Sequence, residues 1–237
     1  MMPAALNSER LSLSLTRLLA RKWFLLFLIL YGLWVWMPFF APLFMHLGWE
    51  SAAKGLYIFY SFFCHQLPQR SFFLFGSQIG YSLEEIQAAW LNTINPLLLR
   101  QFSGTPEMGW KVAWSDRMIA FYGSIWLFAF LWYTLRRRIK GLTFWGMVLF
   151  LLPMLVDGST HFISDLAGIG QGFRDQNLWL AQLTNYAFPL DFYRGDAPGS
   201  FNSWMRLISG VLSGAGTVWF AFPYLEKTFL PEEGGLE

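Results

Sequence analysis

The stretch from Trp23 to His46 reads WFLLFLILYGLWVWMPFFAPLFMH and contains no Asp, Glu, Lys or Arg. An α-helix rises about 1.5 Å per residue, so a run of this length can cross the roughly 30 Å hydrocarbon core of a bilayer. The run is too long for the apolar core of a signal peptide, and no small-residue cleavage site follows it. We therefore predict a membrane helix that is retained in the protein.

The composition of the whole chain agrees with this prediction. Hydrophobic residues make up 55% of the sequence and charged residues only 14%, with 13 Trp and 25 Phe, which is typical of an integral membrane protein. The net charge of +2 is too small to favour nucleic-acid binding. A single Cys excludes an intrachain disulfide, and no sequence motif identifies a cofactor.

Apolar runs predict three further membrane helices, at about 118–135, 142–164 and 203–224. We expect one transmembrane domain over residues 23–225, because no linker divides it. A basic segment at 1–22 precedes it, with leucines spaced as in a helix that lies on the membrane surface. The acidic tail at 226–237 is expected to be flexible.

Residues 55–75 begin with an uncharged run that is too short for a membrane helix and contains Pro68. We predict a re-entrant or interfacial element there. Farther along, Ser82 and Glu85 have the spacing of a capping box, followed by apolar residues at helical intervals up to Pro96. These features predict a short amphipathic helix on the outer surface. The expected fold class is an all-α integral membrane protein.

The distribution of basic residues predicts the orientation. With four membrane helices, residues 1–22, the cluster at 136–140 and the tail share one side, and they carry nine of the 17 Lys and Arg. The positive-inside rule makes this side cytoplasmic, and with it both termini. Residues 55–75 then lie on the extracytoplasmic side.

Polar residues converge on that outer side. Asp157, His161 and Asp165 have a spacing of four residues, so they share one face of the third predicted helix. A buried carboxylate needs a partner, and we expect Arg206 to pair with Asp157. The candidate ligand-binding residues at this level are Cys64, His65, Gln66, Arg70, Arg117, Tyr122, Asp157, Thr160, His161, Asn202 and Arg206.

Three short motifs resemble an uncharacterised family of prokaryotic membrane proteins called domain of unknown function 2085. Residues 64–73 read CHQLPQRSFF, residues 157–161 read DGSTH, and Arg206 is followed by Gly210 and Gly214. A further family element contains two cysteines, and this chain has Ser115 and Met118 in their places. The resemblance implies a shared fold and a prokaryotic cytoplasmic (inner) membrane location with several passes. It implies no activity.

Structural roles are alternatives to ligand binding at these positions. Asp157 and Arg206 could form a buried ion pair that sets helix register, and Arg70 and Arg117 could extend to lipid headgroups. Cys64 could pack as a small apolar residue, and His65 could bond to backbone carbonyls. His65, Asp157 and His161 are the candidate metal ligands, but one Cys and two His make a weak set.

Three functions agree with the sequence. We expect a polytopic membrane protein with a polar pocket on the extracytoplasmic side that binds an anionic ligand such as a lipid headgroup. A membrane-embedded enzyme that modifies lipids or depends on a metal is the first alternative. An accessory or scaffold subunit is the second, with membrane-protein partners or a homo-oligomer formed through its small-residue helix face.

Overall fold

The computed structural model describes residue 16 and residues 18–229. It is mostly helical, and four helical segments are long and apolar enough to cross a membrane. This result confirms the predicted membrane protein with four membrane helices. The segments are Trp23–His46, Asp116–Leu135 (α7), Phe144–Asp165 (α8) and Phe201–Phe229 (α12).

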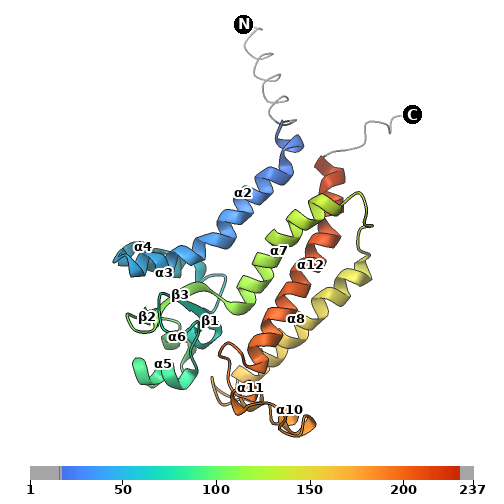
Figure 1. Ribbon diagram of the computed structural model, residues 1–237. Coiled ribbons are helices and arrows are strands. Elements are labelled where there is room, and N and C mark those ends of the chain that lie inside the picture. Colours follow the sequence, from blue (N-terminus) through green and yellow to red (C-terminus); the bar gives the residue numbers. More distant parts are fainter. Residues whose placement is uncertain (1–15, 17, 230–237) are drawn as a thin grey trace, which may run out of the picture.

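The first of these segments is not one continuous α-helix. It consists of α2 (Trp23–Trp36), the 3-10 turn η1 (Met37–Phe39) and α3 (Phe40–His46). Pro38 lies in the 3-10 turn, where the missing amide hydrogen of proline costs least. Figure 1 shows that the chain leaves the line of α2 at this point and turns into α3.

Small residues bring α12 close to α7. Gly214 of α12 is buried, and a Cβ atom added there would overlap the Ser124 hydroxyl and lie 2.8 Å from the Phe121 carbonyl oxygen. Helices in membranes pack closely where such small residues face each other. The predicted small-residue face of the fourth membrane helix is therefore its contact with α7.

Two segments outside the four helices form the wide end of the molecule (Figure 1). The first joins α3 to α7. It contains α4 (Glu50–Tyr60), η2 (Pro68–Arg70), β1 (Ser71–Leu74), α5 (Leu83–Ala89), α6 (Pro96–Leu99), β2 (Gly104–Thr105) and β3 (Gly109–Ser115). The second joins α8 to α12 and contains α9 (Phe173–Gln176), α10 (Leu178–Leu183) and α11 (Leu190–Tyr193).

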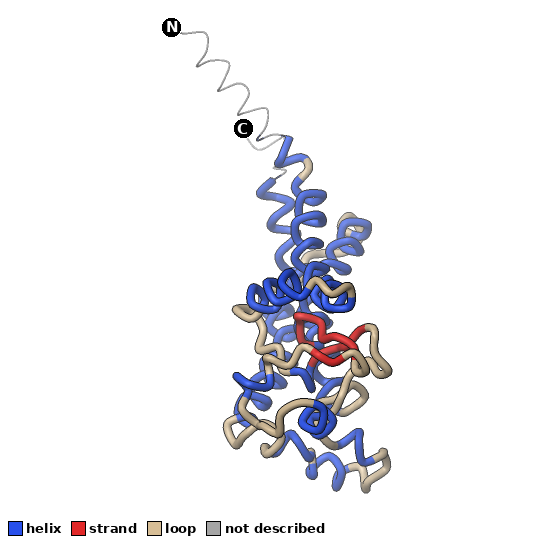
Figure 2. Tube along the Cα trace, turned by 90° about the vertical axis from the view of Figure 1, so that its left-hand side faces the viewer, coloured by secondary structure: helices blue, strands red, loops and turns tan. Residues whose placement is uncertain are grey.

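The strands form a small antiparallel sheet in the order β1-β3-β2. Figure 2 shows this sheet in red below the helices of the α3–α4 pair. It is an addition to the predicted all-α architecture. Its central strand, β3, ends at Ser115, and α7 begins at the next residue. The sheet therefore positions the first turn of α7.

The predicted element at 55–75 contains the last part of α4, a turn, η2 and β1. None of these described elements has the length of a membrane helix, and a re-entrant or interfacial position remains a prediction. The capping box is confirmed, since Glu85 N donates to Ser82 Oγ and Ser82 N donates to the Glu85 carboxylate. However, α5 ends at Ala89, before Pro96.

Both ends of the described chain lie at the end of the bundle opposite the wide end. Figure 1 shows the start of α2, the turn between α7 and α8 and the end of α12 together there. Residues 1–15 and 17 of the predicted surface helix lie outside the described residues. In the predicted tail, residues 226–229 belong to α12 and 230–237 lie outside the described residues.

Candidate functional site

Charged side chains from five parts of the chain meet where the bundle joins the wide end. We call this set the buried charge network. It links helices α7, α8 and α12 with both outer segments through ion pairs of 2.6 to 2.9 Å. Its members are Arg70, Arg117, Arg174, Arg206, Asp116, Asp157, Asp165, Asp196 and His161.

Arg206 is the most enclosed arginine of the network, with 2% of its surface exposed. Its Nε and Nη2 donate to the Asp116 carboxylate at 2.7 to 2.9 Å, and its Nη1 donates to Asp196 Oδ1 at 2.6 Å. Paired donors of this kind give charge-assisted bonds with defined geometry. The predicted pairing of Arg206 with Asp157 is therefore wrong, because Asp116 is already placed opposite Arg206 by the contact between α7 and α12.

Asp157 has two other arginines as partners. Arg117 Nη2 donates to Asp157 Oδ2 at 2.7 Å, and Arg174 Nη2 donates to Oδ1 at 2.9 Å. Arg174 also donates to Thr160 Oγ1 at 2.7 Å and to Asn202 Oδ1 at 3.0 Å. Thr160 and Asn202, both predicted site residues, thus position Arg174 against Asp157.

Arg70 connects the first outer segment to the second. Its Nη1 and Nη2 donate to the two oxygens of Asp165 at 2.7 Å, and its Nε donates to Asp196 Oδ2 at 2.7 Å. Burial alone would raise the pKa of Asp196, but Arg70 and Arg206 hold that pKa well below its usual value. Burial likewise opposes the charge of Arg70, while Asp196 and Asp165 raise its pKa.

His161 lies at the centre of the network and is 3% exposed. Its Nδ1 is 3.4 Å from Asp157 Oδ1, and its Nε2 is 3.4 Å from Asp196 Oδ1. Arg117 and Arg206 approach the same two ring nitrogens at 3.3 and 3.4 Å. The imidazole therefore bridges the Asp157 and Asp196 parts of the network.

Cys64 begins an irregular turn that ends in the network. Its Sγ accepts hydrogen bonds from the backbone N–H groups of Gln66, at 3.4 Å, and Ser115, at 3.3 Å. Gln66 has a φ of 54°, in the region that L residues rarely adopt. Its side-chain Nε2 donates to the Tyr57 carbonyl oxygen at 2.9 Å. Cys64 is buried and His65 is exposed.

Lys111, from β3, supports the same turn. Its side chain is fully buried, and Nζ donates to the carbonyl oxygens of Gln66 and Arg100 at 2.8 Å. Burial lowers the pKa of Lys111 to about 7, because the charged ammonium has lost its water. The lysine thus stabilises the strained backbone of Gln66 through a hydrogen bond to the carbonyl oxygen of that residue.

The turn and the network enclose a cavity of about 60 Å³, which we call the arginine cavity. Three arginines line it, and none of the described Asp or Glu side chains belongs to its wall. Ser115 and Met118 share this wall with Cys64. The lining residues are Cys64, His65, Gln66, Leu67, Arg70, Ser115, Arg117, Met118 and Arg206.

One donor in this wall is unused. Arg117 Nε is buried and has no hydrogen-bond partner among the residues that the structure describes. A buried donor without an acceptor costs roughly 1–3 kcal/mol. Each lining arginine already pairs with a carboxylate that is not part of this wall. The arginine cavity therefore presents three guanidinium groups and one unsatisfied donor, and an anion oxygen could accept from that donor.

Not all predicted site residues meet. Cys64, His65, Gln66, Arg70, Arg117 and Arg206 line the arginine cavity, while Asp157, Thr160, His161 and Asn202 belong to the network or hold it. Tyr122 is elsewhere, packed against Trp34 and Trp114 with ring centroids 6.0 and 4.8 Å apart. Tyr122 is thus part of an aromatic cluster.

The candidate metal ligands do not form a metal site. His161 lies beside Asp157, but His65 is on the rim of the arginine cavity. Among residues 16 and 18–229, no group of three or more His, Cys, Asp or Glu side chains could hold a metal ion.

The sequence interpretation missed the carboxylates Asp116 and Asp196 and the arginine Arg174 as site residues. Asp116 directly precedes Arg117, so the pair of adjacent charges at the start of a membrane helix was an available signal. Arg174 and Asp196 lie in the irregular segment between α8 and α12, where no periodicity indicates which way a side chain points.

Comparisons with known proteins give one distant relative. The chain is 26% identical over 163 residues to the uncharacterized protein MJ1492 of Methanocaldococcus jannaschii. This alignment covers 65% of the present chain and 80% of the archaeal protein. No protein-family model and no solved structure matches the chain.

Proposed function

We propose that this membrane protein binds one phosphate-type anion, the headgroup of an anionic lipid, in the arginine cavity. The observation that carries the proposal is the unpartnered Nε of Arg117 in a wall that contains three arginines and no described carboxylate. A guanidinium offers several donors in one plane, an arrangement that fits phosphate oxygens.

The size of the cavity supports a small anionic group. A water molecule needs roughly 10–15 Å³ of such space, so about 60 Å³ accommodates a few waters or one tetrahedral oxyanion. The whole ligand would not fit, and only its headgroup phosphate would enter. The rest of a lipid needs an apolar surface next to the cavity.

The residues just before Cys64 provide such a surface. Phe62 is 80% exposed and Phe63 is 48% exposed. Both precede the cavity residues Cys64 and His65 by one to three positions, so acyl chains could pack on these rings while the phosphate enters the cavity. This arrangement favours a lipid over a free phosphate ion.

The proposal places the cavity at the outer surface of a prokaryotic cytoplasmic membrane. The basic turn at 136–140 would face the cytoplasm, in line with the positive-inside rule. The network carboxylates would then fix the positions of the arginines without binding the ligand. They pair with Arg70, Arg117 and Arg206 and are not part of the cavity wall.

Native mass spectrometry of the full chain, released from nanodiscs of phosphatidylglycerol and phosphatidylcholine, tests the proposal. We expect wild type to retain phosphatidylglycerol and Arg117→Gln to retain at least tenfold less. Asp157 keeps Arg174 as a partner in this variant, so the fold should survive. The matched control is Arg137→Gln, which removes the same charge from an exposed position at the opposite end of the bundle.

Equal lipid retention by Arg117→Gln and Arg137→Gln would overturn the proposal. A titration with inorganic phosphate separates the two sources of the anion. If free phosphate displaces the lipid at micromolar concentration, the cavity is a site for the free ion, and the assignment to a lipid headgroup is wrong.

A further inference from the structure

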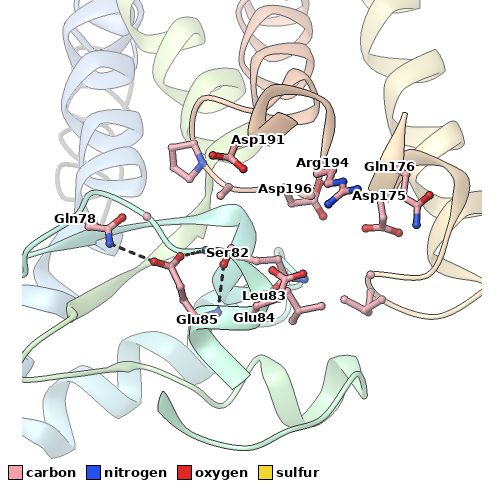
Figure 3. Close-up of a pocket in the computed structure, with 17 residues that line it drawn as sticks. Gln78, Ser82, Leu83, Glu84, Glu85, Asp175, Gln176, Asp191, Arg194 and Asp196 are labelled. Atoms are coloured by element: carbon pink, nitrogen blue, oxygen red, sulfur yellow. Dashed lines mark hydrogen bonds between the residues drawn. The ribbon is translucent and has the colours of Figure 1, made fainter. Parts of the chain in front are cut away.

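A second cavity lies between the two outer segments of the wide end. Its volume is about 730 Å³, within the range of small-molecule sites. One wall comes from the region of α5, and the other comes from the chain between α8 and α12 (Figure 3). The walls touch at Gly80, where a side chain would overlap Pro198. We call this space the acidic cavity.

Carboxylates dominate the lining of the acidic cavity. Glu84, Glu85, Asp175, Asp191 and Asp196 take part in it, together with one basic side chain, that of an exposed arginine. Figure 3 shows these acidic groups on both walls, with the α5 residues facing those of the second outer segment.

Two of the five carboxylates have both of their oxygens bonded within the protein. Asp196 is paired with Arg70 and Arg206. Glu85 accepts the N–H of Ser82 at 2.7 Å and so caps α5. Asp175 has one oxygen engaged, because its Oδ2 accepts the N–H of Gly172 at 2.7 Å.

The other three carboxylates lack a cation. Glu84, Asp175 and Asp191 form no ion pair with any residue that the structure describes. Burial, and next the charge of Asp196, raises the pKa of Asp175 to about 6, because the charged form is poorly stabilised there. The acidic cavity is therefore short of positive charge.

Gln69 gives an independent sign of an absent ligand. It forms part of the same wall and is only 2% exposed. Neither its amide nitrogen nor its amide oxygen has a hydrogen-bond partner in the described part of the chain. Buried amides are nearly always hydrogen-bonded, so a bound group with both a donor and an acceptor, such as an amine with its hydration water, would complete this one.

The kind of cation follows from how the carboxylates are spread. A metal ion needs its ligands within about 2.6 Å of one point, and the described residues contain no His, Cys, Asp and Glu group that could hold one. An organic polyamine carries several ammonium groups along a chain, and each terminal ammonium has three donors. Such a molecule reaches carboxylates on opposite walls.

We propose that the acidic cavity binds an organic polyamine, with Glu84 on one wall and Asp175 and Asp191 on the other, and with the Gln69 amide as a further hydrogen-bonding group. The site is separate from the arginine cavity in charge and in lining, although Arg70 and Arg206, which line the arginine cavity, both pair with Asp196 of the acidic one.

Isothermal titration of the full-length protein in nanodiscs with spermidine tests this proposal. We expect the double variant Glu84→Gln/Asp191→Asn to lower spermidine affinity at least tenfold. Glu84 on α5 and Asp191 on α11 are both exposed, so both changes should leave the fold intact. The matched control is Glu107→Gln, an exposed acidic residue of the same outer segment as Glu84 that does not line the cavity.

A second variant separates ligand binding from a purely structural role. Gln69→Leu keeps the side-chain volume and removes the two unpartnered amide atoms, so we expect unchanged or higher thermal stability together with at least threefold weaker spermidine binding. The proposal is overturned if wild type does not bind spermidine, or if the double variant binds it as wild type does. Displacement of spermidine by an equal charge of Mg²⁺ would also overturn it, because that result indicates general charge screening.

Discussion

Two buried basic side chains of this protein, Arg206 and Lys111, have opposite kinds of partner. Arg206 is 2% exposed and has carboxylates of Asp116 and Asp196 around its guanidinium. Lys111 is fully buried, and its Nζ donates to the backbone carbonyl oxygens of Gln66 and Arg100 and lies 5.8 Å from the centre of the Tyr57 ring. None of the described carboxylates pairs with it. Arg206 keeps its charge in the membrane bundle, while the ammonium of Lys111 gives up its proton near neutral pH.

The difference shows what each region requires. A guanidinium hardly ever loses its proton, so the protein must supply carboxylates wherever it buries one. A lysine shifts its pKa readily when it is buried, so carbonyl oxygens are enough. The arginine of the helix α12 therefore needs carboxylates from other segments, whereas the lysine of the strand β3 is held by backbone carbonyl oxygens of other segments.

The largest loss of stability is expected when Arg206 loses one of its carboxylate partners and so becomes more like Lys111. Asp116→Asn replaces one carboxylate with a neutral group of the same shape. Removing one member of a buried ion pair costs roughly 3–5 kcal/mol, so the midpoint of thermal unfolding in detergent should fall clearly. Glu107→Gln, at an exposed site, is the control. Equal midpoints for the two variants would show that Asp116 contributes little.

The next effect is the pH dependence of stability that Lys111 causes. The pKa of this lysine is about 7 in the folded protein and about 10.5 in the unfolded chain. The unfolded state therefore binds the extra proton between these values, and the stability of wild type rises with pH across that window, by about 1.4 kcal/mol per pH unit. Below pH 7 the contribution of the neutral lysine is lost.

Lys111→Met should abolish this rise. Thermal unfolding measured from pH 7.5 to 9 should show wild type gaining roughly 2 kcal/mol over the variant as the pH increases. Lys140→Met, at an exposed position, should instead follow wild type. Parallel curves for wild type and Lys111→Met would mean that the buried lysine stays charged.

The smallest effect concerns the helix contact that brings Arg206 and Asp116 together. Gly214→Ala adds a methyl group against Ser124 and the Phe121 carbonyl, and such overpacking costs about 1–3 kcal/mol. Gly123→Ala is the control, since no atom of the described chain lies within 4 Å of a Cβ added there. A similar unfolding midpoint for both variants would indicate that α7 and α12 adjust freely.

The sequence was sufficient for the parts of the fold that depend on a long local pattern. The predicted membrane helices at 118–135 and 142–164 begin and end within two residues of α7 and α8. The capping box at Ser82 was also found, because its signal lies within four residues. The last helix runs five residues past its predicted end, since Glu226 and Lys227 do not stop a helix that leaves the membrane.

Pairings between distant segments could not be predicted in this way. The residue types of the candidate site were found, because arginine, aspartate and histidine at the ends of membrane helices are rare and need compensation. The partners of these residues were not predicted, because the positions of Arg174 and Asp196 depend on how the irregular segment between α8 and α12 folds. The strand β3 was missed because Lys111 interrupts its apolar pattern. The sequence also gives no sign of the partners of this lysine, which are backbone carbonyl oxygens.

The division of charges among segments also governs the order in which the chain can mature during synthesis. Helix α8 carries Asp157 and Asp165, together with His161, but no Lys or Arg of its own. Arg117 of α7 is made before α8, while Arg174 follows α8 in the second outer segment. Asp157 therefore acquires its full set of partners only after that segment has been made and has folded back. Asp116 acquires its partner later still, because Arg206 lies in α12, the last helix to be made. A chain arrested after α8 would already contain Arg117 and Arg70, the partners of Asp157 and Asp165. It would lack Arg206, so Asp116 would have no arginine partner of this network.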